Sequence, residues 1–129
     1  MTEPIFLTLA DVLKIHNKQL DAHGGIHGIR DEGLLESAVM TPQASFGGEY
    51  LHSDIFEMAA AYAFHIAENQ PFLDGNKRTA LVAALAFLDL NGSVIVDPER
   101  KLYSMLIDIA NRAADKSDLA DLLRSLPTE

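Results

Sequence analysis

Two long apolar segments, residues 54–69 and 76–90, constrain the fold of this chain more than any other feature. In each segment the apolar side chains would cover a wide face of a helix, which indicates packing against several neighbours. Both segments therefore predict buried helices. Ser53 with Asp54 starts the first segment and Pro71 ends it, and Asn91-Gly92 is a typical C-terminal stop for the second. We therefore expect two central helices joined by a short loop.

The segments before this pair predict two further helices. Thr8 with Asp11 resembles a capping box, with Asp in place of the usual Glu or Gln, and opens a helix that the glycines after His23 end. Asp31 can cap a second helix, which Pro42 ends.

The remaining segments complete the predicted architecture. Residues 44–51 hold Gly47-Gly48 and predict either an irregular loop or a short hairpin, and residues 93–96 are short and extended. Asp97 followed by Pro98 resembles an N-cap with proline at the first helical position, and Ser117 opens a last helix. We expect an all-α fold, a compact bundle of about six helices with at most one minor β-hairpin, in a single domain over residues 1–129.

Composition narrows the class of protein. The 129 residues are 48% apolar, enough for one core, and contain no cysteine, which excludes disulfides and thiolate chemistry. Ten basic and 19 acidic residues give a net charge of −9, which disfavours direct binding to nucleic acid or an anionic membrane. Residues 1–9 show neither a signal peptide nor a membrane span. The expected location is the cytoplasm.

The loop between the two central helices is the strongest candidate for chemistry. Gly75 lets the backbone approach a ligand, and the amides of residues 75–78 begin a helix, where they form an anion site. Lys77 and Arg78 add positive charge, and Arg suits phosphate oxygens. Asp74 would repel a bare phosphate, which favours a bridging Mg²⁺. An alternative of equal weight on physics alone makes Asp74 an N-cap and the two cations solvated surface charges.

A resemblance to a known family favours the first interpretation. The loop is similar to the Fic/Doc signature His-x-Phe-x-Asp/Asn/Glu-Gly/Ala-Asn-Lys/Gly-Arg, which Phe72, Asp74, Gly75, Asn76 and Arg78 match by position. Lys77 and the following Thr79-Ala80-Leu81 resemble the Doc branch, and residues 24–38 add to the likeness. The resemblance covers roughly residues 7–123.

The resemblance implies a helical bundle and transfer of part of ATP, with Mg²⁺, to a protein hydroxyl. Phe72, Gly75, Asn76, Lys77 and Arg78 would bind the nucleotide, and Asp74 the metal. Doc-type toxins transfer the γ-phosphoryl group to a threonine of elongation factor Tu and so block translation, whereas typical Fic members transfer AMP. Lys77 and Leu81 stand where AMP-transferring members usually have a glycine and a second arginine, which favours the kinase.

One motif position departs from the family. Gln70 stands where the catalytic histidine, which takes the proton of the attacking hydroxyl, is expected. An amide cannot accept that proton near pH 7, so we expect severely impaired catalysis. The sequence does not separate a natural Gln70 from a substituted histidine. His65 lies about 140° around the preceding helix from Gln70 and predicts a packed histidine rather than a replacement base.

Other features are expected to be structural or to concern partners. Phe72 is predicted to pack beneath the loop, Arg30 and Asp31 to form a helix cap and ion pair, and the scattered histidines do not suggest zinc. Residues 44–51 resemble the family flap that aligns the target, although an ordinary surface loop fits almost as well. No inhibitory helix motif fits at residues 45–49, so the resemblance implies a separate antitoxin. A Doc-type kinase, a Fic-type AMP transferase and a non-catalytic module that binds nucleotide or antitoxin remain open.

Overall fold

The computed structural model describes residues 3–129, so the first two residues of the N-terminal segment considered above lie outside it. Helices α1 (Leu9–His23) and α2 (Glu32–Met40) precede a short 3₁₀ turn at Thr41–Gln43. Strands β1 (Ser45–Phe46) and β2 (Glu49–Tyr50) pair antiparallel as a small hairpin, with Phe46 opposite Glu49. Helices α3 (Ile55–Asn69), α4 (Asn76–Leu90), α5 (Lys101–Ala110) and α6 (Lys116–Ser125) follow.

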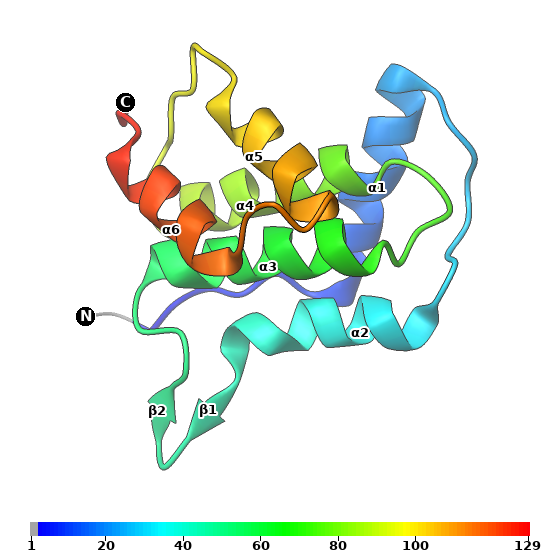
Figure 1. Ribbon diagram of the computed structural model, residues 1–129. Helices are drawn as coiled ribbons and strands as arrows, with labels where there is room; N and C mark the ends of the chain where they lie inside the picture. The colour runs from blue at the N-terminus through cyan, green and yellow to red at the C-terminus, as the bar shows by residue number, and fades with distance from the viewer. Residues whose placement is uncertain (1–2) are drawn as a thin grey trace.

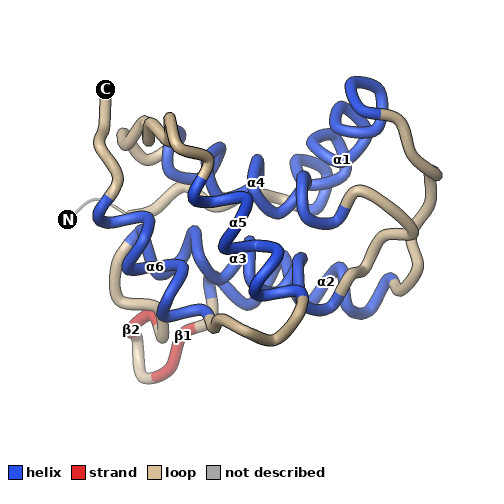
Figure 2. The backbone as a smooth tube through the Cα atoms, turned by 45° about the horizontal axis from the view of Figure 1, so that its top comes forward, coloured by secondary structure: helices blue, strands red, loops and turns tan. Residues whose placement is uncertain are grey.

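Helix α3 is the centre of the bundle (Figure 1). It packs against α2, α4, α5 and α6, while α1 packs against α4. Its alanines at positions 59–61, 63 and 67 are at most 1% exposed, because small side chains let the neighbouring helices approach closely. The prediction of two central buried helices is confirmed, and the loop that joins them lies at one end of the bundle, near the end of α1 (Figure 2).

Local capping explains why most helix boundaries were predictable. The Thr8 hydroxyl accepts from the Asp11 amide while the Asp11 carboxylate accepts from the Thr8 amide, so the capping box of α1 is confirmed. The carboxylates of Asp31 and Asp54 cap α2 and α3 by accepting from the third amide beyond each of them. These caps satisfy amides that have no partner inside the helix.

Two predicted helix starts were wrong. Helix α5 begins at Lys101 rather than at Pro98, because residues 98–100 form a turn and the Asp97 carboxylate reaches across it to accept from the amides of Lys101 and Leu102. Helix α6 is capped by Asp115, whose carboxylate accepts from the Asp118 amide, rather than by Ser117. In both cases the side chain of an earlier Asp sets the start.

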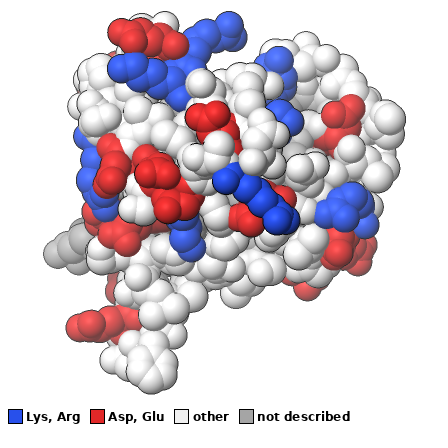
Figure 3. All heavy atoms as spheres, viewed as in Figure 1, with Lys and Arg blue, Asp and Glu red and all other residues white. Residues whose placement is uncertain are grey.

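Charged side chains of both signs are mixed on the surface rather than gathered in separate regions. On the face shown in Figure 3, acidic and basic side chains are interspersed, without a continuous basic stripe. Arg124 of α6, for example, contacts Asp54 at 3.0 Å and Glu57 at 3.3 Å. Among the described residues 3–129, no helix is long and apolar enough to cross a membrane.

Candidate functional site

The turn between α3 and α4 leaves the N-terminus of α4 open. Gln70 ends α3 in the left-handed conformation (φ 48°, ψ 60°), and Gly75 precedes α4 with φ 77°. No side chain caps α4, so the amides of its first turn are not consumed by a neighbouring carboxylate or hydroxyl. The alternative in which Asp74 is the N-cap was therefore wrong. An uncapped helix N-terminus attracts anions through its free amides and the helix dipole.

Asn76 holds the loop closed. Its side-chain oxygen accepts from the Phe72 amide at 3.0 Å, and its side-chain nitrogen donates to the Phe72 carbonyl at 3.0 Å. The side chain of Asn76 is thus committed to the loop, and only its backbone amide remains for a ligand.

Phe72 and His16 form the floor of the loop. Phe72 is 1% exposed, and its ring stacks on the imidazole of His16 with centroids 3.7 Å apart and planes 7° apart. Nε2 of His16 donates to the carbonyl of Asp74 at 2.9 Å, and burial lowers the pKa of His16. His16 is therefore the neutral tautomer with its proton on Nε2. Phe72 lies beneath the loop, as predicted, and its contribution to a ligand site is indirect.

The segment between α1 and α2 clamps the other side of the loop. The Leu73 amide donates to the Gly28 carbonyl at 3.0 Å, and the Arg30 amide donates to the Pro71 carbonyl at 2.7 Å. The Arg30 guanidinium donates to the carbonyls of Gln70 and Asn69 at 2.7 and 2.5 Å. The predicted pairing of Arg30 with Asp31 was wrong, because Arg30 instead caps the exposed carbonyls at the C-terminus of α3.

Asp74 is oriented by backbone amides. One carboxylate oxygen accepts from the Gly75 amide at 2.9 Å and the other from the Ile26 amide at 3.1 Å. Gly25 lies so close that a Cβ atom there would be 2.9 Å from the Asp74 carboxylate. The aspartate is thus fixed at the rim of the loop, with the remaining lone pairs of its oxygens available to a cation.

The residues from Asp74 to Arg78 come together around one hollow of about 370 Å³ at the start of α4. The end of α1 supplies another wall through His23 and Gly24, and Tyr103 of α5 closes a third side. The Arg78 guanidinium lies 5.5 Å from the centroid of the Tyr103 ring, a cation–π contact that orients it. Gln70 and Phe72 do not line this hollow, since Gln70 is exposed at the other end of the loop.

His65 does not approach the loop. Its Nε2 lies 3.3 Å from Nζ of Lys116, which is also 3.1 Å from Nε2 of His52. Burial and the neighbouring Lys116 lower the pKa of His65 to about 4. The prediction of a packed histidine is confirmed, and no group of three or more metal-ligating side chains occurs among residues 3–129.

Sequence reasoning did not identify three residues of the site: His16, Arg30 as a loop clamp, and Tyr103. His16 had a usable signal, because Val12, His16 and Leu20 follow one another at four-residue spacing and share a buried face. A polar side chain on such a face needs a hydrogen-bond partner. The contacts of Arg30 and Tyr103 join segments far apart in the chain and left no local signal.

Comparison with known proteins gives the class of this fold and site. A sequence model described as the Fic/DOC family matches residues 6–88, and the chain belongs to that family. It is 35% identical over 117 residues to "Protein kinase doc" of Escherichia phage P1, which covers 90% of both chains. It is also 37% identical over 102 residues to "Toxin Doc" of Mycolicibacterium smegmatis, which covers 77% of this chain and 78% of that protein.

Proposed function

We propose that this chain is a Doc-like toxin of a toxin–antitoxin module whose α3–α4 loop binds ATP for transfer of the γ-phosphoryl group to a threonine of elongation factor Tu. The observation that carries the proposal is the uncapped N-terminus of α4, with Lys77 and Arg78 beside its free amides. Phosphate oxygens suit both donors, since the amides lie at the positive end of the helix dipole. The relatives named as Doc toxin and kinase support the same assignment.

The donor set at Asp74 fits Mg²⁺ together with a phosphate. Mg²⁺ in phosphoryl-transfer sites is commonly held by one or two carboxylates plus phosphate oxygens. Asp74 supplies one carboxylate, already oriented by the amides of Gly75 and Ile26, at the edge of the hollow that would hold the phosphates. Bound Mg²⁺ would neutralise phosphate charge, which Lys77 and Arg78 would otherwise balance alone.

In the proposed step, the threonine oxygen forms a bond to the γ-phosphorus while the bond from that phosphorus to the bridging oxygen breaks and ADP leaves. The helix amides, Lys77 and Arg78 stabilise the charge on the transferred group. The hydroxyl proton passes to solvent water in this chain, because position 70 carries no base. Gln70 can accept a hydrogen bond from the hydroxyl but cannot take its proton, so the reaction is slowed by about 10²–10⁴-fold relative to a chain with a base there.

The hairpin and the antitoxin complete the proposal. Phe46, 83% exposed in β1, and the backbone edges of the hairpin are available for a target segment, in line with a flap that aligns the threonine. Residues 45–50 form a hairpin rather than the inhibitory helix of other family members, which supports inhibition by a separate antitoxin chain. Gln70 favours one other candidate, a non-catalytic module that binds nucleotide or antitoxin.

The decisive experiment restores the base. Gln70→His and Gln70→Asn proteins are incubated with ATP, Mg²⁺ and elongation factor Tu, and the target is analysed by mass spectrometry. Both replacements tolerate the left-handed backbone at this position, but only histidine can accept a proton. We expect phosphate on a threonine with Gln70→His alone. A gain in mass equal to AMP would make the chain a Fic-type AMP transferase, and no transfer by Gln70→His would favour the binding module.

A further inference from the structure

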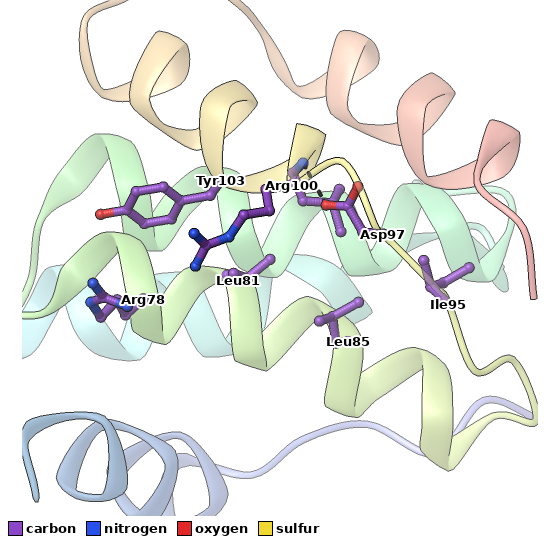
Figure 4. Close-up of a pocket in the computed structure, with 8 residues that line it drawn as sticks. Arg78, Leu81, Leu85, Ile95, Asp97, Arg100 and Tyr103 are labelled. Carbon is purple, nitrogen blue, oxygen red and sulfur yellow. Dashed lines mark hydrogen bonds between the residues drawn. The ribbon is translucent and has the colours of Figure 1, made fainter. Parts of the chain in front are cut away.

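A cluster of one ammonium and two imidazoles lies where α6 packs against α3. Nζ of Lys116, the first residue of α6, lies 3.1 Å from Nε2 of His52 and 3.3 Å from Nε2 of His65. The hollow between α4 and α5 shares Arg78 and Tyr103 with the candidate site and adjoins it (Figure 4). The cluster shares no residue with either of those hollows, so the nucleotide site does not explain it.

The chemistry of the three groups fixes the positions of their protons. An ammonium has three donors and no acceptor, so Lys116 donates one proton to each Nε2. Both imidazoles are therefore neutral, with their own proton on Nδ1. Within residues 3–129, the third ammonium proton has no hydrogen-bond partner. Its loss would leave a lone pair on Nζ while both hydrogen bonds to the imidazoles remain.

The surroundings of Lys116 oppose its positive charge. Burial lowers the pKa of Lys116, and in the described part of the chain no carboxylate forms an ion pair with it. Its position at the start of α6 adds to this effect, because the positive end of the helix dipole repels a cation. Glu57 acts in the opposite direction, but its carboxylate already pairs with Arg124 at 3.3 Å. A lysine in such a place is a better nucleophile than an exposed one.

Lys116 lies at the wall of a hollow of about 350 Å³, which has room for a small ligand. His52 lines the same hollow, whereas His65 does not. Nδ1 of His52 is buried, and among residues 3–129 it has no hydrogen-bond partner. A buried donor without a partner destabilises a fold, so a purely structural role does not account for the cluster. Of the two imidazoles, His52 is the one placed to exchange a proton with Lys116 beside a ligand.

We propose that Lys116 is a modification site that accepts an acyl group from an activated acyl donor, an acyl phosphate or a thioester, with His52 as the proton acceptor. The ammonium first loses its third proton to water. The Lys116 nitrogen then forms a bond to the acyl carbon, while the bond from that carbon to the phosphate oxygen or the thioester sulfur breaks and phosphate or thiolate leaves. The proton released by the nitrogen passes to Nε2 of His52, 3.1 Å away, and from there to solvent.

Acylation would also change the contact between α6 and α3. The product amide has one N–H group, which can donate to only one of the two imidazoles, whereas the ammonium donates to both. The positive charge is lost as well. The modified chain should therefore hold α6 less firmly against α3, and this inference does not depend on the proposed kinase activity.

Mass spectrometry of acetylated lysines tests the proposal. The unchanged chain is incubated near neutral pH with acetyl phosphate or, separately, with acetyl-CoA, and the rate of acetylation is followed at each lysine. Lys18 and Lys101 are internal controls, because both are exposed and should stay protonated. We expect Lys116 to react at least about tenfold faster than either control with at least one donor, and that donor identifies the source of the acyl group. Acetylation of Lys116 no faster than that of Lys18 with both donors overturns the proposal.

Two matched variants separate a proton acceptor from a structural contact. His52→Gln keeps an acceptor for Lys116 but cannot take its proton, so the rate at Lys116 should fall at least about tenfold while the rate at Lys18 is unchanged. His65→Gln makes the same change outside the hollow and should lower the rate by less than about threefold. Equal rates at Lys116 in the two variants overturn the role of His52.

A measurement on the unchanged chain covers the case in which His52→Gln does not fold, which circular dichroism would show. The acetylation rate of Lys116 should level off at a lower pH than that of Lys18, because the surroundings of Lys116 oppose its charge. Identical pH profiles for the two lysines overturn the proposal.

Discussion

Replacing Asn76 by alanine should destabilise the loop and the fold together. The change removes two hydrogen bonds of 3.0 Å and leaves the amide and the carbonyl of Phe72 without partners. Phe72 itself is only 1% exposed. Each lost bond costs about 1 kcal/mol, and each backbone group left without a partner adds up to a similar amount where water cannot reach it. Since the site is only partly buried, the expected loss in the free energy of unfolding is about 2–3 kcal/mol.

Urea denaturation followed by circular dichroism measures this loss. With a denaturant slope of about 1–3 kcal/mol per molar urea, a loss of about 2–3 kcal/mol lowers the midpoint by about 0.7–3 M while the slope stays constant. Asn76→Asp keeps the acceptor for the Phe72 amide but cannot donate to the Phe72 carbonyl. Its free energy of unfolding should therefore lie between those of the unchanged chain and Asn76→Ala. Asn17→Ala is the control, because Asn17 is exposed on α1. A midpoint for Asn76→Ala within about 0.2 M of the unchanged chain would refute this account of the loop.

Three further outcomes are expected. Gly25→Ala should weaken ATP binding in Mg²⁺ far more than Gly24→Ala. Both glycines have positive φ, so alanine at either position destabilises the fold by about 1–3 kcal/mol, but only at Gly25 would the new Cβ displace the Asp74 carboxylate. Equal ATP affinities of the two variants by calorimetry would contradict this prediction. The free energy of unfolding should fall with acid, because the pKa of His65 is about 4 in the folded chain and near 6.5 in the unfolded chain. The loss begins as the pH falls through about 6.5 and continues to about 4, with a slope of up to about 1.4 kcal/mol per pH unit. Urea titrations at several pH values should find a shallower slope in His65→Gln. His16→Ala should weaken ATP binding without altering the helix content, since it removes both the hydrogen bond to the Asp74 carbonyl and the stack on Phe72; an unchanged affinity would show that the loop holds its shape unaided.

Local rules explain why most of the fold was predictable. Apolar periodicity identified the two central helices, and Thr8, Asp31 and Asp54 marked helix starts because a capping side chain binds amides only two or three residues away. Prediction failed where the same kind of side chain had two possible partners. Asp97 could cap a helix that begins at once or, as it does, reach across a turn to a helix that begins at Lys101.

In the candidate site, too, some features follow from the local sequence and others from tertiary contacts. The sequence by itself determined that residues 74–78 combine a carboxylate, a glycine and two cations at the start of a helix, and that Gln70 lacks a base. Only the tertiary structure decided which groups stay free for a ligand. It commits the Asn76 side chain to Phe72, brings His16 and Arg30 to the loop, and sets Tyr103 beside Arg78. These contacts join segments tens of residues apart, and packing rather than local propensity determines which of them meet.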